Sequence, residues 1–577
     1  MKLNTENAMY LDENVPLPRV EGKITVKKVR GTEYVYFETG RVYDRARKFN
    51  VPRRRLVGKM AGEGWMLPNE NYAKFFPRKA PKTRNGRGEA AQRSACVRAG
   101  AFLVLRKIAE EKGLPGILER LFSKEDAAML LDLAAYSIVC EDNAAQYFPD
   151  YERTHPLFAP GMPIRSDSAV SAFYGSVGGE RPLEFVSAWN ARRDKSERIW
   201  VSYDSTNKIS QAGDLEMVEF GRAKDGGGRP VFGVAIGWDK THREPLFWEE
   251  YPGSVVDVSQ LRWMLAKVRG LGYACVGFIL DRGYFSRANI EAMDEGGHAF
   301  LLMVKGMKRL VSGLVEKVRG TFESRLAARA RRNGVYGTSV EAKLWEDDKR
   351  TRWVHVFHSS ALEAAERAEL EAQMDRAERW LAAHAGQAAP AEPWIRRHYA
   401  LGVEKTSGLL LGWTPRTDVL EREMRLCGYF ALVSSEKMTA AEALALYKGR
   451  DPSEKLFRAD KSHLGDRTPR VQSDAALAGK NLTEFLALIL RNRIHTGLLD
   501  ALETMDKRPN WMNVPAAIRE LEKIEMVRLP DGLYRLDYAL TATQKTILAA
   551  FGIDELSATV QLAALAPALA KPSVPSE

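Results

Sequence analysis

The sequence predicts an α/β protein built around a five-stranded mixed sheet with helices, and three observations support this. Strand-like and helix-like segments follow one another in the order β-β-β-α-β-α-β over residues 191–305. The chain has 577 residues, which is too long for one ordinary domain. Apolar residues make up 45% of it, which is enough for real cores. We therefore expect an α/β core with smaller units before and after it.

The N-terminal third is expected to hold two small units. Residues 20–60 alternate between apolar and polar side chains in the manner of strands, so residues 1–77 are expected to form a small β-rich unit. Residues 78–190 begin with a basic linker, whose first thirty residues hold nine Lys or Arg and one acid, Glu89. Helical periodicity follows, and the helix predicted within 164–177 is either the second helix of a helix-turn-helix or part of a structural bundle. We expect 78–190 to be a helical DNA-binding domain, and the first 190 residues to bind DNA as a fragment.

The first part of the core, 191–305, contains five predicted strands. The first runs into Asp204, and the fourth is a solidly apolar strand that ends at Asp281. This order matches the ribonuclease H-like fold, in which the first and fourth strands lie side by side and parallel. Asp204 and Asp281 should then meet at neighbouring strand ends, where such sheets carry their active groups.

The rest of the chain is expected to form four further parts. Residues 306–425 interrupt the core with strand-like pieces and a long helix, which indicates a β-rich insertion domain. Residues 426–503 return to the core with a strand, a helix and the stretch "YKGRDPSEKLFRADK". A small helical unit is predicted over 504–565, and the tail 566–577 is expected to be disordered.

The charge of the chain favours a polyanionic partner. The formal net charge is +11 and the sequence pI is about 9.2. Nucleic acid is the simplest partner for an excess of this size.

Cysteine, histidine and apolar patterns exclude other classes of protein. The four cysteines are far apart and form no CxxC pair, so a zinc ribbon or a disulfide framework is not expected. His355 and His358 in "WVHVFH" are expected to be ordinary strand residues on opposite faces. No run of 18 apolar residues and no signal-peptide core are present, so we expect a cytoplasmic protein without membrane contact.

Carboxylates on adjacent strands are the ligands that a magnesium site needs. Mg²⁺ prefers oxygen ligands in octahedral geometry and keeps several waters. Two such ions, about 3.5–4 Å apart, can clamp a scissile phosphate between the attacking and the leaving oxygen. Asp204 and Asp281, joined by a third carboxylate from a helix, would supply that site.

Three motifs together carry a resemblance to a known family. "YDST", "LDRGYFS" and the pattern Y-x2-R-x3-E-x6-K occur in this order along the chain. They resemble the DDE transposases of bacterial insertion sequences, and most closely the insertion-sequence-four-like group with its YREK signature. Tyr447, Arg450, Glu454 and Lys461 match the spacing of that signature without a gap. The resemblance covers roughly residues 190–500, and the family also places a β-rich insertion between the second Asp and the Glu.

The resemblance implies an enzyme that cuts and joins DNA. Glu454 would be the third catalytic carboxylate, and the three would hold two Mg²⁺ ions, for which Mn²⁺ can substitute. Tyr447, Arg450 and Lys461 would lie near the transposon-end DNA, where Arg grips phosphate as a fork and Lys as a point charge. The partners would be double-stranded DNA of the transposon ends and the target, and a second copy of the chain in a synaptic complex. A bacterial, nucleoid-associated location would follow.

Several alternatives remain open on the sequence. On one continuous helix the four signature residues would share a face, but Pro452 predicts that a helix begins there, so that Glu454 could complete a capping box with Asp451.

The family holds a flipped base with an aromatic residue, and the candidates are Trp345, Trp353 and Trp413.

Two alternative functions go with these motifs. One is a domesticated transposase that binds specific DNA without cutting it, and the other is a ribonuclease H-like nuclease. All three carboxylates argue against the first, and the insertion and the YREK spacing argue against the second.

Overall fold

The computed structural model divides the chain into two compact units. One comprises residues 1–92 with 572–577, and the other comprises residues 93–571. The residues that the structure describes are 14–20, 22–29, 31–44, 49–76, 93–159, 166–210, 215–220, 228–255, 257–323, 325–330, 334–450, 464, 468–506 and 508–570. Among them, no helix has the length and apolar character needed to cross a lipid bilayer.

The first unit is a small antiparallel sheet with one short helix, as its alternating sequence predicts. Its elements are β1 (Val15–Pro16), β2 (Ile24–Val29), β3 (Thr32–Asp44), β4 (Phe49–Met60), β5 (Trp65–Pro68) and α1 (Glu70–Phe75). The strand order is β1-β5-β4-β3-β2. Five buried side chains form its own core: Val15, Val35, Val57, Met66 and Tyr72.

The second unit is centred on a mixed sheet whose middle strands are parallel. Its first five main strands are β7 (Ile199–Ile209), β9 (Pro230–Asp239), β10 (Glu244–Pro252), β11 (Val276–Leu280) and β12 (Ala299–Met303). They lie in the order β10-β9-β7-β11-β12, in which β7, β11 and β12 are parallel and β9 and β10 are antiparallel to their neighbours. The predicted adjacency of the first and fourth strands is therefore confirmed. The helices α8 (Asp257–Gly270) and α9 (Arg287–Glu295) and the 3-10 turn η2 (Arg282–Tyr284) connect the strands. A short strand, β8 (Glu219–Phe220), pairs with β9.

The same sheet continues into residues that the sequence assigned to a separate insertion. Beyond β12 follow β18 (Tyr429–Ser434), β15 (Arg352–His358), β14 (Val335–Ala342) and β13 (Arg329–Ala330). β18 pairs antiparallel with β12 on one side and with β15 on the other. The predicted insertion domain 306–425 therefore needs correction, because three of its strands, β13, β14 and β15, extend the central sheet. The physical reason is that the apolar β15 is buried along most of its length and can complete the free edge of β18.

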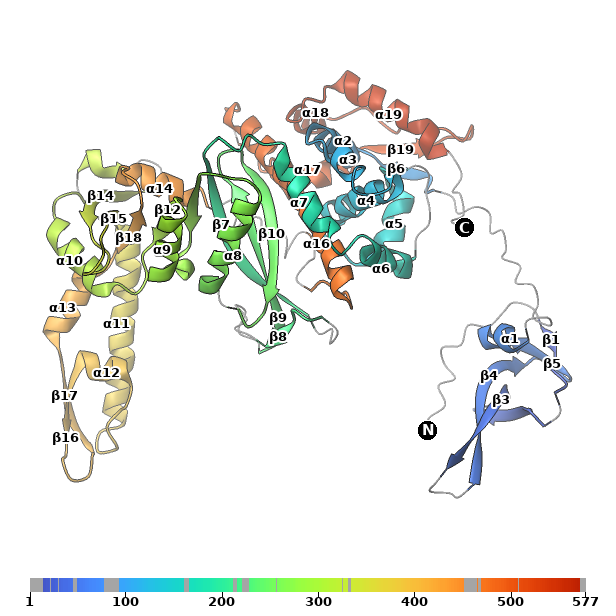
Figure 1. The fold of residues 1–577 in the computed structure, drawn as a ribbon, viewed down its shortest axis with the longest axis horizontal. Helices are drawn as coiled ribbons and strands as arrows, with labels where there is room; N and C mark the ends of the chain where they lie inside the picture. Colours follow the sequence, from blue (N-terminus) through green and yellow to red (C-terminus); the bar gives the residue numbers. More distant parts are fainter. Residues whose placement is uncertain are drawn as a thin grey trace. The chain divides into compact units, whose positions relative to one another are not determined.

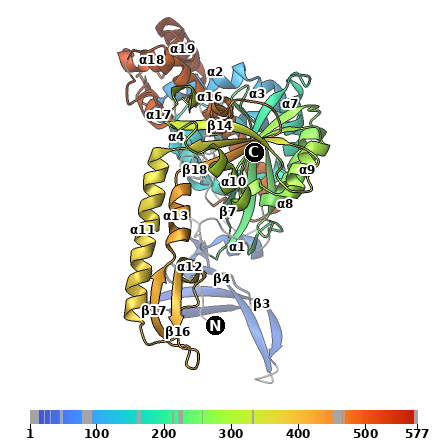
Figure 2. The ribbon, with the colours of Figure 1, turned by 90° about the vertical axis from the view of Figure 1, so that its left-hand side faces the viewer.

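Only the later part of that segment leaves the sheet, as an arm. It consists of α11 (Ser360–Ala383), α12 (Pro393–His398), β16 (Tyr399–Val403), β17 (Leu410–Pro415) and α13 (Thr417–Leu426). Figures 1 and 2 show the arm extending away from the sheet, with the β16–β17 hairpin at its far end. A separate small core, which includes Leu381, Tyr399 and Leu410, holds the arm together. The helix α10 (Lys308–Val318) and the 3-10 turn η3 (Leu326–Ala328) lie between β12 and β13 in the chain.

A long buried helix joins the sheet to the helical part of the second unit. α16 (Asp474–Glu503) has 30 residues and includes the predicted helix 481–494, and most of its side chains are buried. It contacts β10 and five helices. Around it lie α2 (Gly100–Glu111), α3 (Leu114–Leu118), α4 (Lys124–Cys140), η1 (Ala145–Tyr147), α5 (Phe148–Thr154), α6 (Asp167–Ser176) and α7 (Arg181–Ala191). The helix predicted within 164–177 is α6, and its N-cap is Ser166.

The C-terminal residues do not form a unit of their own. β19 (Glu525–Arg528) pairs with β20 (Tyr534–Leu536) and with β6 (Cys96–Arg98), which precedes α2. The remaining elements are α17 (Val514–Leu521), α18 (Ala542–Ala549) and α19 (Glu555–Ala570). The predicted helical unit 504–565 therefore shares a sheet with the N-terminal part of the second unit. The sequence signal was misleading because "EMVR" follows a helix directly and is too short to show strand periodicity.

Candidate active site

Asp204 and Asp281 occupy equivalent places on adjacent parallel strands. In the register between β11 and β7, Ile279 faces Ser202 and Leu280 faces Tyr203. One step further along both strands come Asp281 and Asp204. Neighbouring strands lie about 4.8 Å apart, so the two carboxyl groups are close neighbours. This is the juxtaposition that the sequence predicted.

Both carboxylates project from the sheet face that α14 (Ala440–Lys448) covers. Side chains alternate between faces along a strand, so Asp281 shares a face with Ile279, and Asp204 shares it with Ser202. Ile279 packs in a buried cluster with Leu444 and Tyr447 of α14. The C-terminal end of α14 is thereby held over the strand ends.

The carboxylate of Glu249 belongs to the opposite face of the sheet. Tyr203 alternates with Asp204 and donates a hydrogen bond to Glu249 on β10, with an O–O distance of 2.9 Å. Glu249 also accepts from Gln260, and the ammonium of Lys267 lies 3.5 Å from it. Glu249 is thus fully engaged in a structural network.

Tyr447 and Arg450, two members of the signature, contact Asp281 directly. The Tyr447 hydroxyl lies 3.4 Å from Asp281 Oδ1, and Arg450 Nη1 lies 3.2 Å from the same oxygen. The guanidinium also stands 5.1 Å from the centre of the Tyr447 ring. The resemblance implied a role for Arg450 on DNA, whereas in this structure its partner is a candidate metal ligand.

The end of α14 explains how Arg450 reaches Asp281. α14 begins with a capping box between Thr439 and Glu442 and ends at Lys448, with Gly449 as its C-cap. The backbone N–H of Arg450 donates to the carbonyl of Tyr447 at 3.1 Å, which turns the chain back towards the strand ends. The reading of the signature as one continuous helix is therefore wrong, because the helix stops two residues before Arg450.

A third cation that sequence reasoning missed lies at the same helix end. A Cβ on Gly449 would stand only 2.0 Å from Cε of Lys240, so the lysine side chain lies against this glycine. Burial lowers the pKa of Lys240. Lys240 follows Asp239 in an ordinary turn between β9 and β10, so no local pattern marks it.

Backbone N–H groups of the following residues donate hydrogen bonds to both carboxylates and hold them in place. Asp281 is the N-cap of η2 and accepts from the N–H of Arg282 at 2.7 Å. Asp204 accepts from the N–H of Ser205 at 2.9 Å. The Asp281 side chain is 39% exposed, so the site is open to a ligand from outside.

The other two signature residues, Glu454 and Lys461, lie outside the described residues. Most of the basic linker also lies outside the described residues, and so do Gly226 and Gly227, where the sequence predicts a turn before a strand. In the part of the chain that the structure describes, no three Asp, Glu, His or Cys side chains are grouped so that they could hold a metal ion. Two of three predicted carboxylates are thus placed, and the third remains a prediction.

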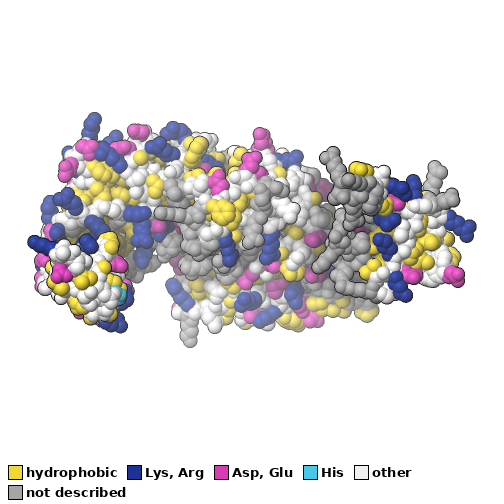
Figure 3. Space-filling model, turned by 90° about the horizontal axis from the view of Figure 1, so that it is seen from below, with side chains coloured by type: hydrophobic (Ala, Val, Ile, Leu, Met, Phe, Trp, Pro, Cys, Tyr) yellow, Lys and Arg dark blue, Asp and Glu magenta, His cyan; other side chains and the backbone are white. Residues whose placement is uncertain are grey.

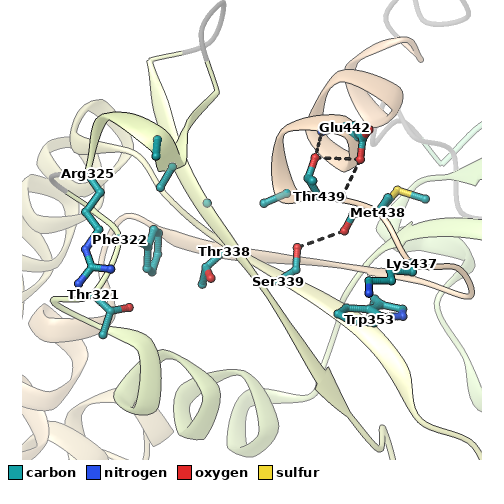
Figure 4. A pocket seen from close by; sticks show the side chains of 14 residues that line it. Thr321, Phe322, Arg325, Thr338, Ser339, Trp353, Lys437, Met438, Thr439 and Glu442 are labelled. Carbon is teal, nitrogen blue, oxygen red and sulfur yellow. Dashed lines mark hydrogen bonds between the residues drawn. The ribbon is translucent and has the colours of Figure 1, made fainter.

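The three candidate tryptophans lie in different surroundings. Trp413 packs in the core of the arm, and Trp345 lies beneath the guanidinium of Arg287 at 5.4 Å. Trp353 lines a cavity of about 700 Å³ at the N-terminal end of α14, with the ammonium of Lys437 5.4 Å from its ring. Figure 4 shows Arg325 and Phe322 on the opposite wall of this cavity.

A buried histidine supports the wall of the same cavity. His355 bonds the hydroxyls of Ser339 and Ser434 at 2.8 and 2.9 Å, and burial lowers its pKa to about 4. Its ring is therefore neutral near pH 7. As the sequence predicted, His355 and His358 are strand residues of β15.

The solved structures that are similar to this chain include two transposase complexes. No protein-family model and no curated protein matches the chain. The structure of a piggyBac transposase synaptic complex with hairpin DNA is 9% identical, covers 73% of this chain and 79% of that chain, and has a TM-score of 0.33. The structure of a pre-cleavage Mos1 transpososome is 12% identical, covers 23% of this chain and 50% of that chain, and has a TM-score of 0.12. Scores this low leave the function to be inferred from the residues of the chain itself.

Proposed function

We propose that this chain is a DNA transposase of the DDE class, which binds terminal inverted repeats, cuts the DNA there and joins the ends to a target. One observation carries the proposal: Asp204 and Asp281 lie in register on adjacent parallel strands, and Tyr447 and Arg450 of the YREK stretch reach Asp281. The strand order β10-β9-β7-β11-β12 supports the further proposal that this part of the sheet is a ribonuclease H-like core.

The residues present fit a magnesium site. Carboxylate oxygens are the donors that Mg²⁺ prefers, and the Asp281 carboxylate is partly open to solvent. Asp204, Asp281 and Glu454 would hold two Mg²⁺ ions, with Mn²⁺ as a substitute. When bound, the ions would lower the pKa of the attacking water and offset the charge of the reacting phosphate.

The protein side chains around the carboxylates would hold the DNA strand. Arg450 bears two parallel N–H donors that match a phosphate, and Tyr447 offers a ring and a hydroxyl beside it. Lys461 would add a point charge. Arg450 must then exchange Asp281 for a phosphate when DNA and metal arrive, and the metal ions would take over the neutralisation of Asp281.

The proposed partners are double-stranded DNA and a second copy of the chain. The net charge of +11 favours binding to a phosphate backbone, and the association should weaken steeply as salt rises. A cut-and-paste reaction joins two ends, so a homodimer in the synaptic complex is part of the proposal. The site of action would be the nucleoid of a bacterial cytoplasm.

Loss of each carboxylate tests the proposal. Asp204→Asn, Asp281→Asn and Glu454→Gln should each abolish strand cleavage in Mg²⁺ and leave DNA binding near normal, because each removes a ligand charge and no DNA-facing cation. The assay is a gel of labelled DNA that carries the inverted repeats flanking the gene. Glu249→Gln, on the opposite face, is the matched carboxylate control and should still cut.

Two results would contradict the proposal in different ways. Cleavage by Asp281→Asn at the parental rate would remove Asp281 from the site. Specific binding by the parent without any cleavage would favour the domesticated DNA-binding alternative. If Glu454→Gln alone kept full activity, Glu454 would be a helix-capping residue.

A further inference from the structure

A long groove opens beside the candidate active site. It has a volume of about 1140 Å³ and lies between α10 on one side and α11 and α13 on the other, with the start of β18 as its floor. Arg282, the residue after Asp281, lines one end of it. We call this the α10–α13 groove. It therefore begins beside Asp281, at the C-terminal end of β11.

The groove carries more positive charge than its walls neutralise. Seven exposed cations line it, and Arg397 and Arg422 are paired with acids. The other five form no ion pair within the described part of the chain: Arg282, Lys305, Lys308, Arg309 and Arg416. Figure 3 shows dark-blue Lys and Arg side chains spread over the left-hand part of the molecule, around the arm.

Most acids in the groove already have partners. Glu366 accepts from the backbone N–H of Gly428 at 2.7 Å. Glu369 pairs with Arg376 at 2.9 Å, and Glu423 pairs with Arg397 and His398. Within the described residues, Asp418 has no hydrogen-bond or ion-pair partner and Glu366 has only a backbone N–H, so five unpaired cations face two carboxylates that no cation neutralises.

The placement of these cations does not serve the stability of the fold. Lys308 and Arg309 begin α10, whose first turn contains no acidic residue. Cations at a helix N-terminus oppose the helix dipole and destabilise the helix. Gly306 has a φ of +76°, and this turn brings Lys305 onto the same rim. A cluster that costs stability is best explained by a ligand of opposite charge.

We propose that the α10–α13 groove binds the phosphodiester backbone of the DNA strand that leaves the active site. The inference rests on the proposed function and adds the path of the DNA beyond the reacting phosphate. Arg282 connects the two regions, because it follows Asp281 and lines the groove. Spaced cations on a rim suit the regular phosphates of a strand, and the apolar floor suits sugars and base faces.

A salt titration of DNA binding by the full chain tests this groove. The probes are a short duplex of arbitrary sequence and one of its isolated strands. In Lys308→Gln/Arg309→Gln, the slope of log affinity against log salt should fall by about 1.8 on the duplex or about 1.4 on the single strand, for two lost phosphate contacts. Arg262→Gln/Arg269→Gln on α8 removes two exposed cations outside the groove and should keep the parental slope.

The outcomes separate this inference from the proposed function. The groove would not be a DNA path if Lys308→Gln/Arg309→Gln kept the parental salt slope. The same conclusion would follow if Arg262→Gln/Arg269→Gln lowered the slope equally. Neither result depends on whether the carboxylate variants cut DNA. A reduced slope in a protein that never cuts DNA would support the groove and count against the transposase. Lys305→Gln as a single change should lower the duplex slope by about 0.9, which checks the double variant for misfolding.

Discussion

At the scale of single residues, the structure gives Arg450 a partner that the sequence did not predict. Its guanidinium is mostly buried, with 13% exposed, and lies against Asp281. An arginine in this place neutralises the carboxylate before any metal arrives. The proposed metal binding at Asp281 would therefore compete with this ion pair.

Removal of the guanidinium should strengthen metal binding. Arg450→Ala is expected to bind Mn²⁺ about 1.4- to fivefold more tightly, since a partly exposed ion pair contributes about 0.2–1 kcal/mol. Calorimetric titration of Mn²⁺ into the full chain without DNA measures this. Arg287→Ala, which breaks an ion pair away from the site, is the control and should bind as the parent does.

The same substitution should slow the steps that need DNA. Without the fork of Arg450, strand transfer is expected to fall by ten- to a hundredfold, for a charged contact of about 1.5–3 kcal/mol. Arg450→Lys should restore only part of the rate, because an ammonium cannot bind two phosphate oxygens in parallel. Tighter Mn²⁺ binding together with an unimpaired transfer rate would contradict the DNA role of Arg450.

At the scale of elements, the hydrogen bonds of His355 tie three strands of the sheet together. Its ring on β15 bonds Ser339 on β14 and Ser434 on β18. Burial lowers the pKa of His355 to about 4. The ordinary value is about 6.5, so the unfolded chain binds more protons than the folded chain between these two pH values.

The buried ring of His355 should make the folded protein less stable in acid. The contribution of His355 is complete above about pH 6.5 and is lost as the pH falls towards 4, by up to about 3 kcal/mol. Urea unfolding at pH 7 and near pH 4.5 should therefore show a larger loss in the parent than in His355→Gln. An identical loss in both proteins would show that the ring is not held neutral.

His242 offers a matched control of opposite sign. Burial lowers its pKa, but the hydrogen bond and the charge of Asp239 raise it by more. Its stabilisation is therefore present below about pH 6.5 and lost as the pH rises through the raised value. His242→Gln should show an acid-induced loss of stability at least as large as that of the parent, because it removes a stabilisation that is present at low pH.

At the scale of the whole molecule, the fold divides at residue 92 and not at residue 190. The first unit has a core of its own, whereas α4, α6 and α7 contact α16, and β6 pairs with β19. The expected DNA-binding fragment 1–190 would therefore expose surfaces that the rest of the chain covers.

Fragments test this division. Residues 1–92 should unfold cooperatively on heating, and residues 93–190 alone should not, because their buried partners are missing. Circular dichroism of the two fragments and of residues 93–571 gives the measurement. A cooperative transition in 93–190 would restore it as an independent domain.

The sequence predicted those parts of the site that depend on local order. Asp281 follows the apolar strand β11, whereas Asp204 lies within β7, which continues to Ile209 and is longer than the sequence indicated. The alternation of strands and helices between the two residues fixes which strand is first and which is fourth. A right-handed parallel connection then leaves few ways to place them. Tyr447 and Arg450 were singled out by the resemblance to the YREK signature, which did not predict their contact with Asp281.

The sequence by itself determined which segments form helices and strands, because periodicity and capping residues act over a few neighbouring residues. The β-rich first unit, α16 and the strands up to β12 all follow from such local signals. Only the tertiary structure decided which edges meet: β15 on β18, β19 on β6, and Arg450 on Asp281. The physical reason is that every strand edge offers the same backbone donors and acceptors, and every arginine the same charge. The partner is therefore chosen by packing across the whole chain, which no short stretch of sequence encodes.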